Sequence, residues 1–300
     1  MSQHIITRPD FDGVVCAVLL QAALGVDLPV LWAQPNDMQN GRIKVTEDDI
    51  ITNLPIYGEC ALWFDHHVSN RIQKPFKGIY RIAPSAAGLV YEYFKERLSP
   101  RFDTLVAQAD KIDDAQLNLD EIRHPERYPY MLVSMTISAD PACGEAYCNH
   151  LVELLRTRSI EEVLADPEVK QRCDLAEAEN KVYGTLLNKY TQVNGAVSIT
   201  DFRRLDPAPN GNRFLVYSLF PETMVNMKIY HEKNQTVVKI GHSIINRNCR
   251  VNVGCLLAKY NGGGHKGAGA CRLDRSDADH KISEILQVLI DNRPMAPENC

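Results

Sequence analysis

The stretch ALWFDHH, residues 61–67, places an apolar run directly before an aspartate and two adjacent histidines. A short apolar run bounded by polar residues is typical of a strand that is buried on both faces of a parallel sheet. In a packed core each imidazole would need partners for both ring nitrogens, whereas open α/β sheets bind ligands at the carboxyl ends of their strands. We therefore expect one imidazole of the pair to bind a metal and the other a phosphate oxygen, with Asp65 holding the tautomer of a histidine.

A second acidic motif, PDFDG at residues 9–13, follows the first expected strand at residues 4–8. The carboxylates of Asp10 and Asp12, two residues apart at a strand end, can bind a hard divalent cation. The alternative is a turn in which Asp and Gly only satisfy the backbone geometry. The presence of Asp-His-His at a later strand end favours the metal site.

Strands alternate with helices along the first part of the chain. Further strands are expected at residues 29–33, 49–54 and 61–64, and helices at residues 13–24, 86–98 and 102–112. This alternation is typical of an α/β domain with a parallel sheet. The polar, proline-free run after Pro167 predicts a long helix over residues 167–190.

A change of pattern after this helix indicates a second domain. The Asn194-Gly195 pair predicts a turn, and strands are expected beyond it at residues 214–220, 227–230 and 236–240, with helices near 253–260 and 278–291. We therefore predict a catalytic domain over residues 1–190 and a smaller α+β domain over residues 195–300, joined by the long helix and a short linker.

The net charge of −5 is unevenly distributed between these parts. Residues 1–194 carry 19 basic and 28 acidic side chains, and residues 195–300 carry 14 and 10. An acidic first part suits a cation site and a basic second part suits a phosphate-binding surface. The alternative is that solvated helices simply differ in composition.

The segment NGGGHKGAGA, residues 261–270, is a candidate anion-binding loop in the second domain. Glycines such as Gly263 and Gly264 let backbone amides approach an anion closely, while His265 and Lys266 add side-chain donors. The alternative is a flexible hairpin turn.

Taken in order, D-x-D-G at residue 10, D-H-H at residue 65 and G-G-G-H-x-x-A at residue 262 resemble the DHH superfamily of phosphoesterases with a DHH-associated C-terminal domain. The group with the most similar motifs includes nano-RNases, phosphodiesterases acting on short oligonucleotides, pAp or cyclic nucleotides, and exopolyphosphatase-like proteins. The resemblance extends from residue 5 to about residue 273.

The resemblance implies roles for particular residues. Asp10, Asp12, His66 and Asp110 match metal ligands for one or two Mn²⁺ ions, with Mg²⁺ as a second candidate and Asp114 as a weaker choice than Asp110. His67, with Asp65, matches the catalytic histidine that faces the substrate phosphate. In the second domain, Arg247 and His265 match residues that hold the terminal phosphate of the substrate, assisted by Lys266 and the amides of Gly263 and Gly264.

Two departures from the family pattern weaken one of the two metal sites. The family has a histidine shortly before the first motif aspartate, where this chain has Ile6, Thr7 and Arg8. The family also has a metal-bridging aspartate at the position of Asn53, which can offer a carbonyl oxygen but no charge. Because carboxylate charge drives binding of hard cations, we expect one good metal site and one weak or absent site.

We therefore predict an Mn²⁺-dependent hydrolase that cleaves phosphodiester or phosphomonoester bonds of short oligonucleotides, pAp or cyclic nucleotides at a terminal phosphate. The alternatives are an exopolyphosphatase and a catalytically weakened nucleotide-binding protein. Phosphate geometry rather than base reading would set specificity, so sequence-specific nucleic-acid binding is not expected.

The start MSQHIITRPDFDG lacks the apolar stretch of a signal peptide, and no apolar run approaches the ~20 residues of a membrane helix. We expect a cytoplasmic protein without membrane contact, and the sequence leaves a homodimer open.

Overall fold

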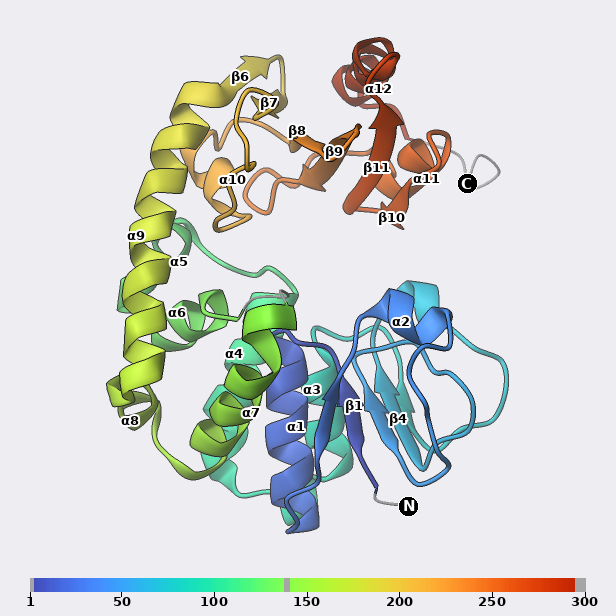
Figure 1. Cartoon of the computed structure of the whole chain (residues 1–300), viewed down its shortest axis with the longest axis vertical. Helices are drawn as coiled ribbons and strands as arrows, with labels where there is room; N and C mark the ends of the chain where they lie inside the picture. Colours follow the sequence, from blue (N-terminus) through green and yellow to red (C-terminus); the bar gives the residue numbers. More distant parts are fainter. Residues whose placement is uncertain (1–2, 138–140, 295–300) are drawn as a thin grey trace. The chain divides into compact units, whose positions relative to one another are not determined.

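The computed structural model describes residues 3–137 and 141–294, which form two compact units (Figure 1). The first unit comprises the residues up to Leu117 together with Pro125–Asp174, and the second comprises Asn118–His124 and the residues from Leu175 onward. The boundary therefore lies inside helix α9 (Pro167–Tyr190), before the boundary expected at residues 190–195. The expected fold class is confirmed, with a parallel-sheet unit followed by a separate unit built on a mixed sheet.

The first unit is built on a five-stranded sheet of order β2-β1-β3-β4-β5 in which every neighbouring pair is parallel. The strands are β1 (Ile5–Thr7), β2 (Val30–Trp32), β3 (Ile50–Thr52), β4 (Leu62–Asp65) and β5 (Gly78–Tyr80). Consecutive side chains on a strand point to opposite faces. Accordingly, Ile5, Ile50 and Phe64 belong to one core cluster, and Ile6, Ile51 and Trp63 to another. The sheet is thus covered on both faces, which is why its strands are continuous apolar runs.

Helices cover the larger of these two clusters. Figure 1 shows α1, α3, α4 and α7 gathered on one side of the sheet. Helix α1 begins at the N-cap Asp10 and ends at Gly25, whose positive φ of 68° suits a left-handed C-cap. The helices are α1 (Phe11–Leu24), α2 (Pro35–Gln39), α3 (Ala86–Tyr93), α4 (Asp103–Asp113), α6 (Pro129–Met135), α7 (Pro141–Thr157) and α8 (Ile160–Ala165), with 3₁₀ turns at Val68–Asn70, Lys95–Arg97, Pro100–Phe102 and Pro125–Arg127.

The second unit is built on a six-stranded sheet of order β10-β11-β9-β8-β7-β6, in which only β7 and β8 run parallel. Helices α11 and α12 bury apolar side chains against this sheet. The elements are α5 (Leu119–Arg123), β6 (Thr191–Asn194), β7 (Val197–Asp201), α10 (Leu215–Leu219), β8 (Val225–Glu232), β9 (Gln235–His242), α11 (Val253–Ala258), β10 (Gly263–His265), β11 (Ala268–Asp274) and α12 (Ala278–Asp291).

Two segments of the second unit differ from the sequence prediction. Residues 214–220 were expected as a strand, but Leu215–Leu219 form helix α10, with the Asn212 side chain accepting a hydrogen bond from the Phe214 amide. A short apolar run has the same pattern in a buried strand and in a buried helix turn, so periodicity does not separate them. The expected linker after α9 is strand β6, which pairs with β7 around a turn at Gly195.

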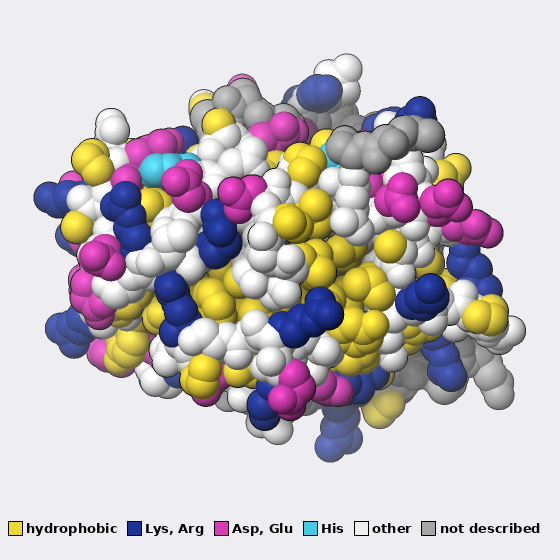
Figure 2. Space-filling view, turned by 90° about the horizontal axis from the view of Figure 1, so that it is seen from below, with side chains coloured by type: hydrophobic (Ala, Val, Ile, Leu, Met, Phe, Trp, Pro, Cys, Tyr) yellow, Lys and Arg dark blue, Asp and Glu magenta, His cyan; other side chains and the backbone are white. Residues whose placement is uncertain are grey.

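Across the residues that the structure describes, none of the helices combines the length and the apolar character needed to span a bilayer. On the face seen in Figure 2, basic and acidic side chains are interspersed around exposed apolar side chains.

A half-buried lysine, Lys228, lies among aromatic rings in the second unit. The Lys228 ammonium donates to the carbonyl oxygen of Pro209 at 2.9 Å and lies within 5.2–5.8 Å of the ring centres of Tyr183, Phe202 and Tyr230. Burial, with a smaller contribution from the charge of Lys239, lowers the pKa of Lys228 to about 8. Between pH 8 and 10.5 the folded chain therefore binds fewer protons here than the unfolded chain.

We expect the stability of the wild-type chain relative to Lys228→Met to rise as the pH increases from about 8 to about 10.5, by on the order of 2 kcal/mol. Below pH 8 the Lys228 ammonium is charged in both the folded and the unfolded chain, so the folded chain bears the full cost of desolvating it. Urea unfolding at several pH values measures the difference. Lys259→Met, in the same unit and with an exposed side chain, is the control. A constant difference across this range would contradict the burial of a charged ammonium.

Candidate metal centre

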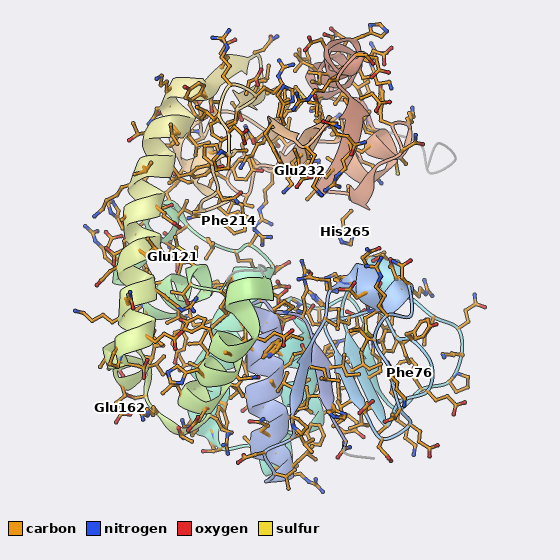
Figure 3. All side chains as sticks on the ribbon, viewed as in Figure 1. Phe76, Glu121, Glu162, Phe214, Glu232 and His265 are labelled. Atoms are coloured by element: carbon orange, nitrogen blue, oxygen red, sulfur yellow. The ribbon has the colours of Figure 1, made fainter. Side chains whose placement is uncertain are left out.

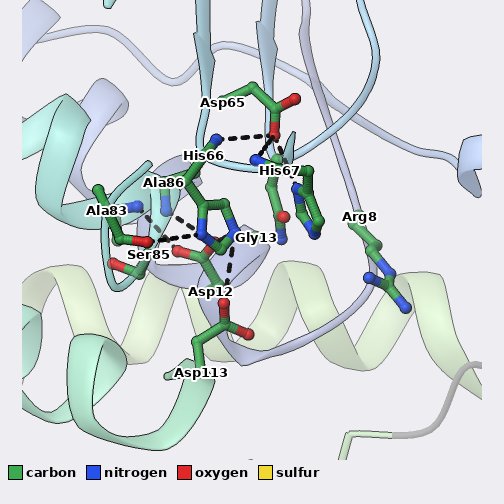
Figure 4. Close-up of polar contacts among 12 residues, drawn as sticks. Arg8, Asp12, Gly13, Asp65, His66, His67, Ala83, Ser85, Ala86 and Asp113 are labelled. Carbon is green, nitrogen blue, oxygen red and sulfur yellow. Dashed lines mark hydrogen bonds and ion pairs between the residues drawn. The ribbon is translucent and has the colours of Figure 1, made fainter. Parts of the chain in front are cut away.

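Neighbouring strands of the first unit bring the predicted site residues to one edge of the sheet. Asp10 and Asp12 follow β1, Asn53 follows β3, and the histidine pair follows β4, and these three strands are adjacent in the sheet. Parallel strands end at the same edge, so residues far apart in the sequence converge there. Figure 4 shows Asp12, Asp65 and both histidines around one centre.

Asp12 is a buried carboxylate held at the start of helix α3. Its two oxygens accept hydrogen bonds from the backbone amides of Ala86 at 3.0 Å and Ala87 at 2.8 Å. Burial and the charge of Asp10 raise the pKa of Asp12 to about 7, and the amides of Ala86 and Ala87 and the charge of His67 oppose this rise. A carboxylate with this environment gains strongly from an adjacent cation, which favours its ionised form.

His66 presents a nitrogen suited to a metal. Its Nδ1 lies 3.0 Å from the carbonyl oxygen of Ala83, which can only accept, so Nδ1 carries the proton and Nε2 carries the lone pair. Nε2 lies 3.7 Å from Oδ2 of Asp12 and 3.4 Å from Oδ2 of Asp113. Within the described residues this nitrogen is buried and has no hydrogen-bond partner. A buried lone pair facing two carboxylates is the arrangement of a metal ligand.

Asp113, the last residue of α4, lies beside this nitrogen, whereas the sequence pattern suggested Asp110 as the ligand. Ligand atoms of Asp12, His66 and Asp113 lie within 4.8 Å of one another. Asp110, one turn earlier, accepts a 2.5 Å hydrogen bond from the hydroxyl of Ser85, the N-cap of α3. The structure thus brings Asp113 within 3.4 Å of the histidine nitrogen, while Asp110 contacts Ser85 at the start of the helix that holds Asp12 and interacts with His66 electrostatically. The three-residue spacing of the two aspartates puts both on one helix face, a signal that could have suggested Asp113.

Asp114 does not join this group, because it is the C-cap of α4 and accepts a 2.5 Å hydrogen bond from the Gln116 side chain. The assignment of Asp110 or Asp114 as a ligand stays a sequence prediction.

Asp65 is fully buried and anchors His67. Its Oδ1 accepts from Nδ1 of His67 at 2.8 Å and from the amide of His66 at 2.9 Å, and its Oδ2 accepts from the side-chain amide of Asn70 at 2.7 Å. Burial alone lowers the pKa of His67, but the hydrogen bond and charge of Asp65, together with the charge of Asp113, outweigh it and raise this pKa. The contact with Asp65 also fixes the orientation of the His67 ring beside the centre.

The group Asp65, His66 and His67 also brings potential ligand atoms within 4.8 Å of one another. It suits a metal less well, because Asp65 already accepts several hydrogen bonds and His66 directs Nε2 at Asp12 and Asp113. Two carboxylates and one imidazole nitrogen are ligands that Mn²⁺ and Mg²⁺ sites accept, so Asp12, His66 and Asp113 fit a divalent cation.

Asp10 is the N-cap of α1, and its oxygens are engaged by protein donors. Oδ1 accepts from the amide of Gly13 and from Nδ2 of Asn53, both at 2.9 Å, and Oδ2 lies 3.2 Å from Nε of Arg8. Asn53 is almost completely buried. Asp10 and Asn53, both predicted metal ligands, thus contact each other, and the role of each at a metal stays a prediction.

The glycine-rich segment of the second unit forms a hairpin between β10 and β11. Gly264 has a positive φ of 148°, and a Cβ there would lie 2.2 Å from the carbonyl oxygen of Ala268, so glycine is required. Space is open at Gly263. His265 and Lys266 at the tip are exposed, and Figure 3 shows His265 projecting from the end of β10.

Arg247 lies on the segment between β9 and α11, where it is exposed and its Nε donates to the carbonyl oxygen of Ile244 at 3.1 Å. Phosphate binding by this arginine and by the hairpin stays a prediction.

Known proteins share this architecture. No protein-family model matches the chain, and no curated protein matches it. Among solved structures, the chain is similar to the pGpG-specific phosphodiesterase PggH from Vibrio cholerae, at 30% identity and a TM-score of 0.81, over 98% of this chain and 100% of that one. A Mn²⁺ complex of RecJ from Thermus thermophilus matches at 14% identity and a TM-score of 0.64, over 98% of this chain and 52% of that one. An exopolyphosphatase-related protein from Bacteroides fragilis matches at 12% identity and a TM-score of 0.57, over 95% and 92% of the two chains.

Proposed function

The chain belongs to the DHH family of phosphoesterases, and from that premise we propose that it hydrolyses short linear oligonucleotides that carry a terminal phosphate, using one divalent cation at Asp12, His66 and Asp113. The observation that carries the proposal is the buried Nε2 of His66, which faces both carboxylates while Nδ1 is committed to the Ala83 carbonyl. Mn²⁺ is the expected ion and Mg²⁺ the second candidate, since both accept such donors.

The side chains around the centre have different roles in the proposed phosphoester hydrolysis. A bound divalent cation lowers the pKa of a coordinated water and offsets charge on the phosphoryl oxygens. Asp65 fixes the orientation of the His67 ring by accepting a hydrogen bond from Nδ1–H, and the charge of Asp65 stabilises an imidazolium at this position. His67 would then donate to a phosphoryl oxygen of the substrate as charge develops there.

We assign the terminal phosphate to the second unit. Arg247, His265 and Lys266 supply positive charge and donors, and the amides of Gly263 and Gly264 can approach an anion where no Cβ intervenes. The net positive balance of residues 195–300 supports this assignment. Because an arginine binds phosphate through several N–H groups of fixed geometry, the phosphate rather than the base would set specificity.

PggH is described as specific for pGpG, and the proposed phosphate recognition suits the same kind of molecule. We therefore choose the linear dinucleotide pGpG as the first substrate to assay, and regard a cytoplasmic location as a prediction from the sequence.

With Mn²⁺ present, we expect pGpG to be hydrolysed about 10- to 100-fold more efficiently than GpG, which lacks the terminal phosphate. The factor follows from losing one hydrogen-bonded charged group, which costs about 1.5–3 kcal/mol. Measurement of kcat/KM by chromatography on pGpG, GpG, pAp, a cyclic dinucleotide and polyphosphate tests this. EDTA should abolish turnover, and re-added Mn²⁺ should restore it.

Two outcomes of this panel would reject the proposal. Cleavage of polyphosphate alone would favour the exopolyphosphatase. Tight nucleotide binding without turnover of any member would favour a catalytically weakened binding protein, the alternative that the engaged Asp10 and Asn53 support.

A further inference from the structure

The candidate centre has two halves, one at Asp12 and Asp113 and the other at Asp10. They differ in the groups that face their carboxylates. At Asp12 and Asp113 the neighbouring imidazole nitrogen has no hydrogen-bond partner among the described residues, so the site offers a lone pair. At Asp10 the opposite holds, because protein donors approach both oxygens: Arg8 on one, and Asn53 with the Gly13 amide on the other. The first half has the ligands of a cation site, whereas the second already contains the positive charge of the Arg8 side chain.

Asn53 is held in a form that donates to Asp10. It is 2% exposed, its φ of 54° is left-handed, and its backbone amide donates to the carbonyl oxygen of Phe64 at 3.0 Å. With the side-chain oxygen turned toward Asp10, two oxygens would face each other, so the amide nitrogen is the atom at this contact. A metal at Asp10 would therefore meet an N–H donor where it needs a ligand.

Arg8 brings a permanent positive charge to the same carboxylate. Arginine side chains keep their charge in proteins because the guanidinium is a very weak acid. The Arg8 side chain is 40% exposed, so the guanidinium is both paired and open to solvent. Figure 4 shows Arg8 on the side of the centre where His67 lies, and the two residues interact electrostatically.

Resting on the proposed function, we propose that Arg8 takes the place of a second divalent cation. Its guanidinium is paired with Asp10, and Asn53 donates a hydrogen bond to the same carboxylate. The centre then binds one metal ion, with the Arg8 guanidinium beside it. Repulsion between like charges and the loss of the Asp10 oxygens to other donors both oppose a second ion. Arg8 then supplies the positive charge that the second ion would have supplied. Asn53 stands in place of the carboxylate that would have bridged the two ions.

The test is the stoichiometry of Mn²⁺ binding to the metal-free full-length chain, measured by calorimetric titration up to millimolar Mn²⁺ and by electron paramagnetic resonance. We expect one Mn²⁺ per wild-type chain with the spectrum of an isolated ion. The double variant Arg8→Ala/Asn53→Asp removes the guanidinium and places two carboxylates together, and we expect it to bind two ions whose spectrum shows exchange coupling.

Arg42→Ala is the matched control, because it removes another arginine–aspartate ion pair of the first unit, with Asp37 at 3.1 Å. It should bind one Mn²⁺, and circular dichroism checks that all variants are folded. Two ions on the wild-type chain, or one on the folded double variant, would overturn the inference. No ion on the wild-type chain would overturn both this inference and the proposed function. One ion with no hydrolysis of any assayed phosphoester would reject the proposed function alone.

Discussion

Asp113→Asn is expected to lower the affinity of the chain for Mn²⁺ by at least about 100-fold and to reduce phosphoester hydrolysis with it. Changing groups that only support metal ligands typically costs 10- to 100-fold in affinity, so losing a charged ligand costs no less. Oδ2 of Asp113 lies 3.4 Å from the buried Nε2 of His66, close enough for both atoms to bind the same ion. Calorimetric titration with Mn²⁺ measures the affinity directly.

Asp110→Asn is the matched comparison, three residues away on the same helix. Its amide oxygen can still accept from the Ser85 hydroxyl, so the contact that caps α3 is weakened but not removed. We expect Mn²⁺ affinity to change less than about tenfold and the free energy of unfolding to fall by about 1 kcal/mol. The reverse pattern, with affinity lost in Asp110→Asn and kept in Asp113→Asn, would return the ligand to the position that the sequence suggested.

The difference between these two aspartates shows what a sequence pattern can and cannot predict. Residues directly after strands are placed by strand direction, which is why the sequence alone assigns Asp12 and His66 to one sheet edge. An aspartate near the end of a helix is different, because the same helix face repeats about every turn. Only the packing of α4 in its unit decides which turn reaches His66.

Arg8 and Asn53 show a second limit. The sequence shows that the family's histidine is absent from residues 6–8 and that position 53 carries an amide in place of a carboxylate. It does not reveal that the arginine at position 8 contacts Asp10, because that contact depends on where the chain turns between β1 and α1. The sequence alone therefore does not distinguish the loss of a metal ligand from the replacement of a metal ion by an arginine.

Asp65→Asn is expected to lower turnover by about 100- to 10,000-fold, the range over which a positioned acid–base group contributes, while Mn²⁺ affinity changes less than about tenfold. The substitution removes the charge that stabilises an imidazolium at His67 and weakens the bond that orients the ring. The shape of the buried site is kept, because the Asn70 amide can rotate to pair with the new amide. His66 remains oriented by the Ala83 carbonyl, so the metal ligand is preserved.

Tyr80→Phe separates this effect from a general disturbance of the segment. The Tyr80 hydroxyl donates to the backbone carbonyl of His67 at 3.1 Å, and its ring stacks on Trp63, a contact that phenylalanine retains. Turnover should fall less than about tenfold in this variant, since the cost is one neutral hydrogen bond. If Asp65→Asn loses Mn²⁺ binding in parallel with turnover, Asp65 acts through the metal centre rather than through His67. Equal losses in Asp65→Asn and Tyr80→Phe would mean that the charge at position 65 contributes nothing specific, since the two variants share only a weakened hold on His67.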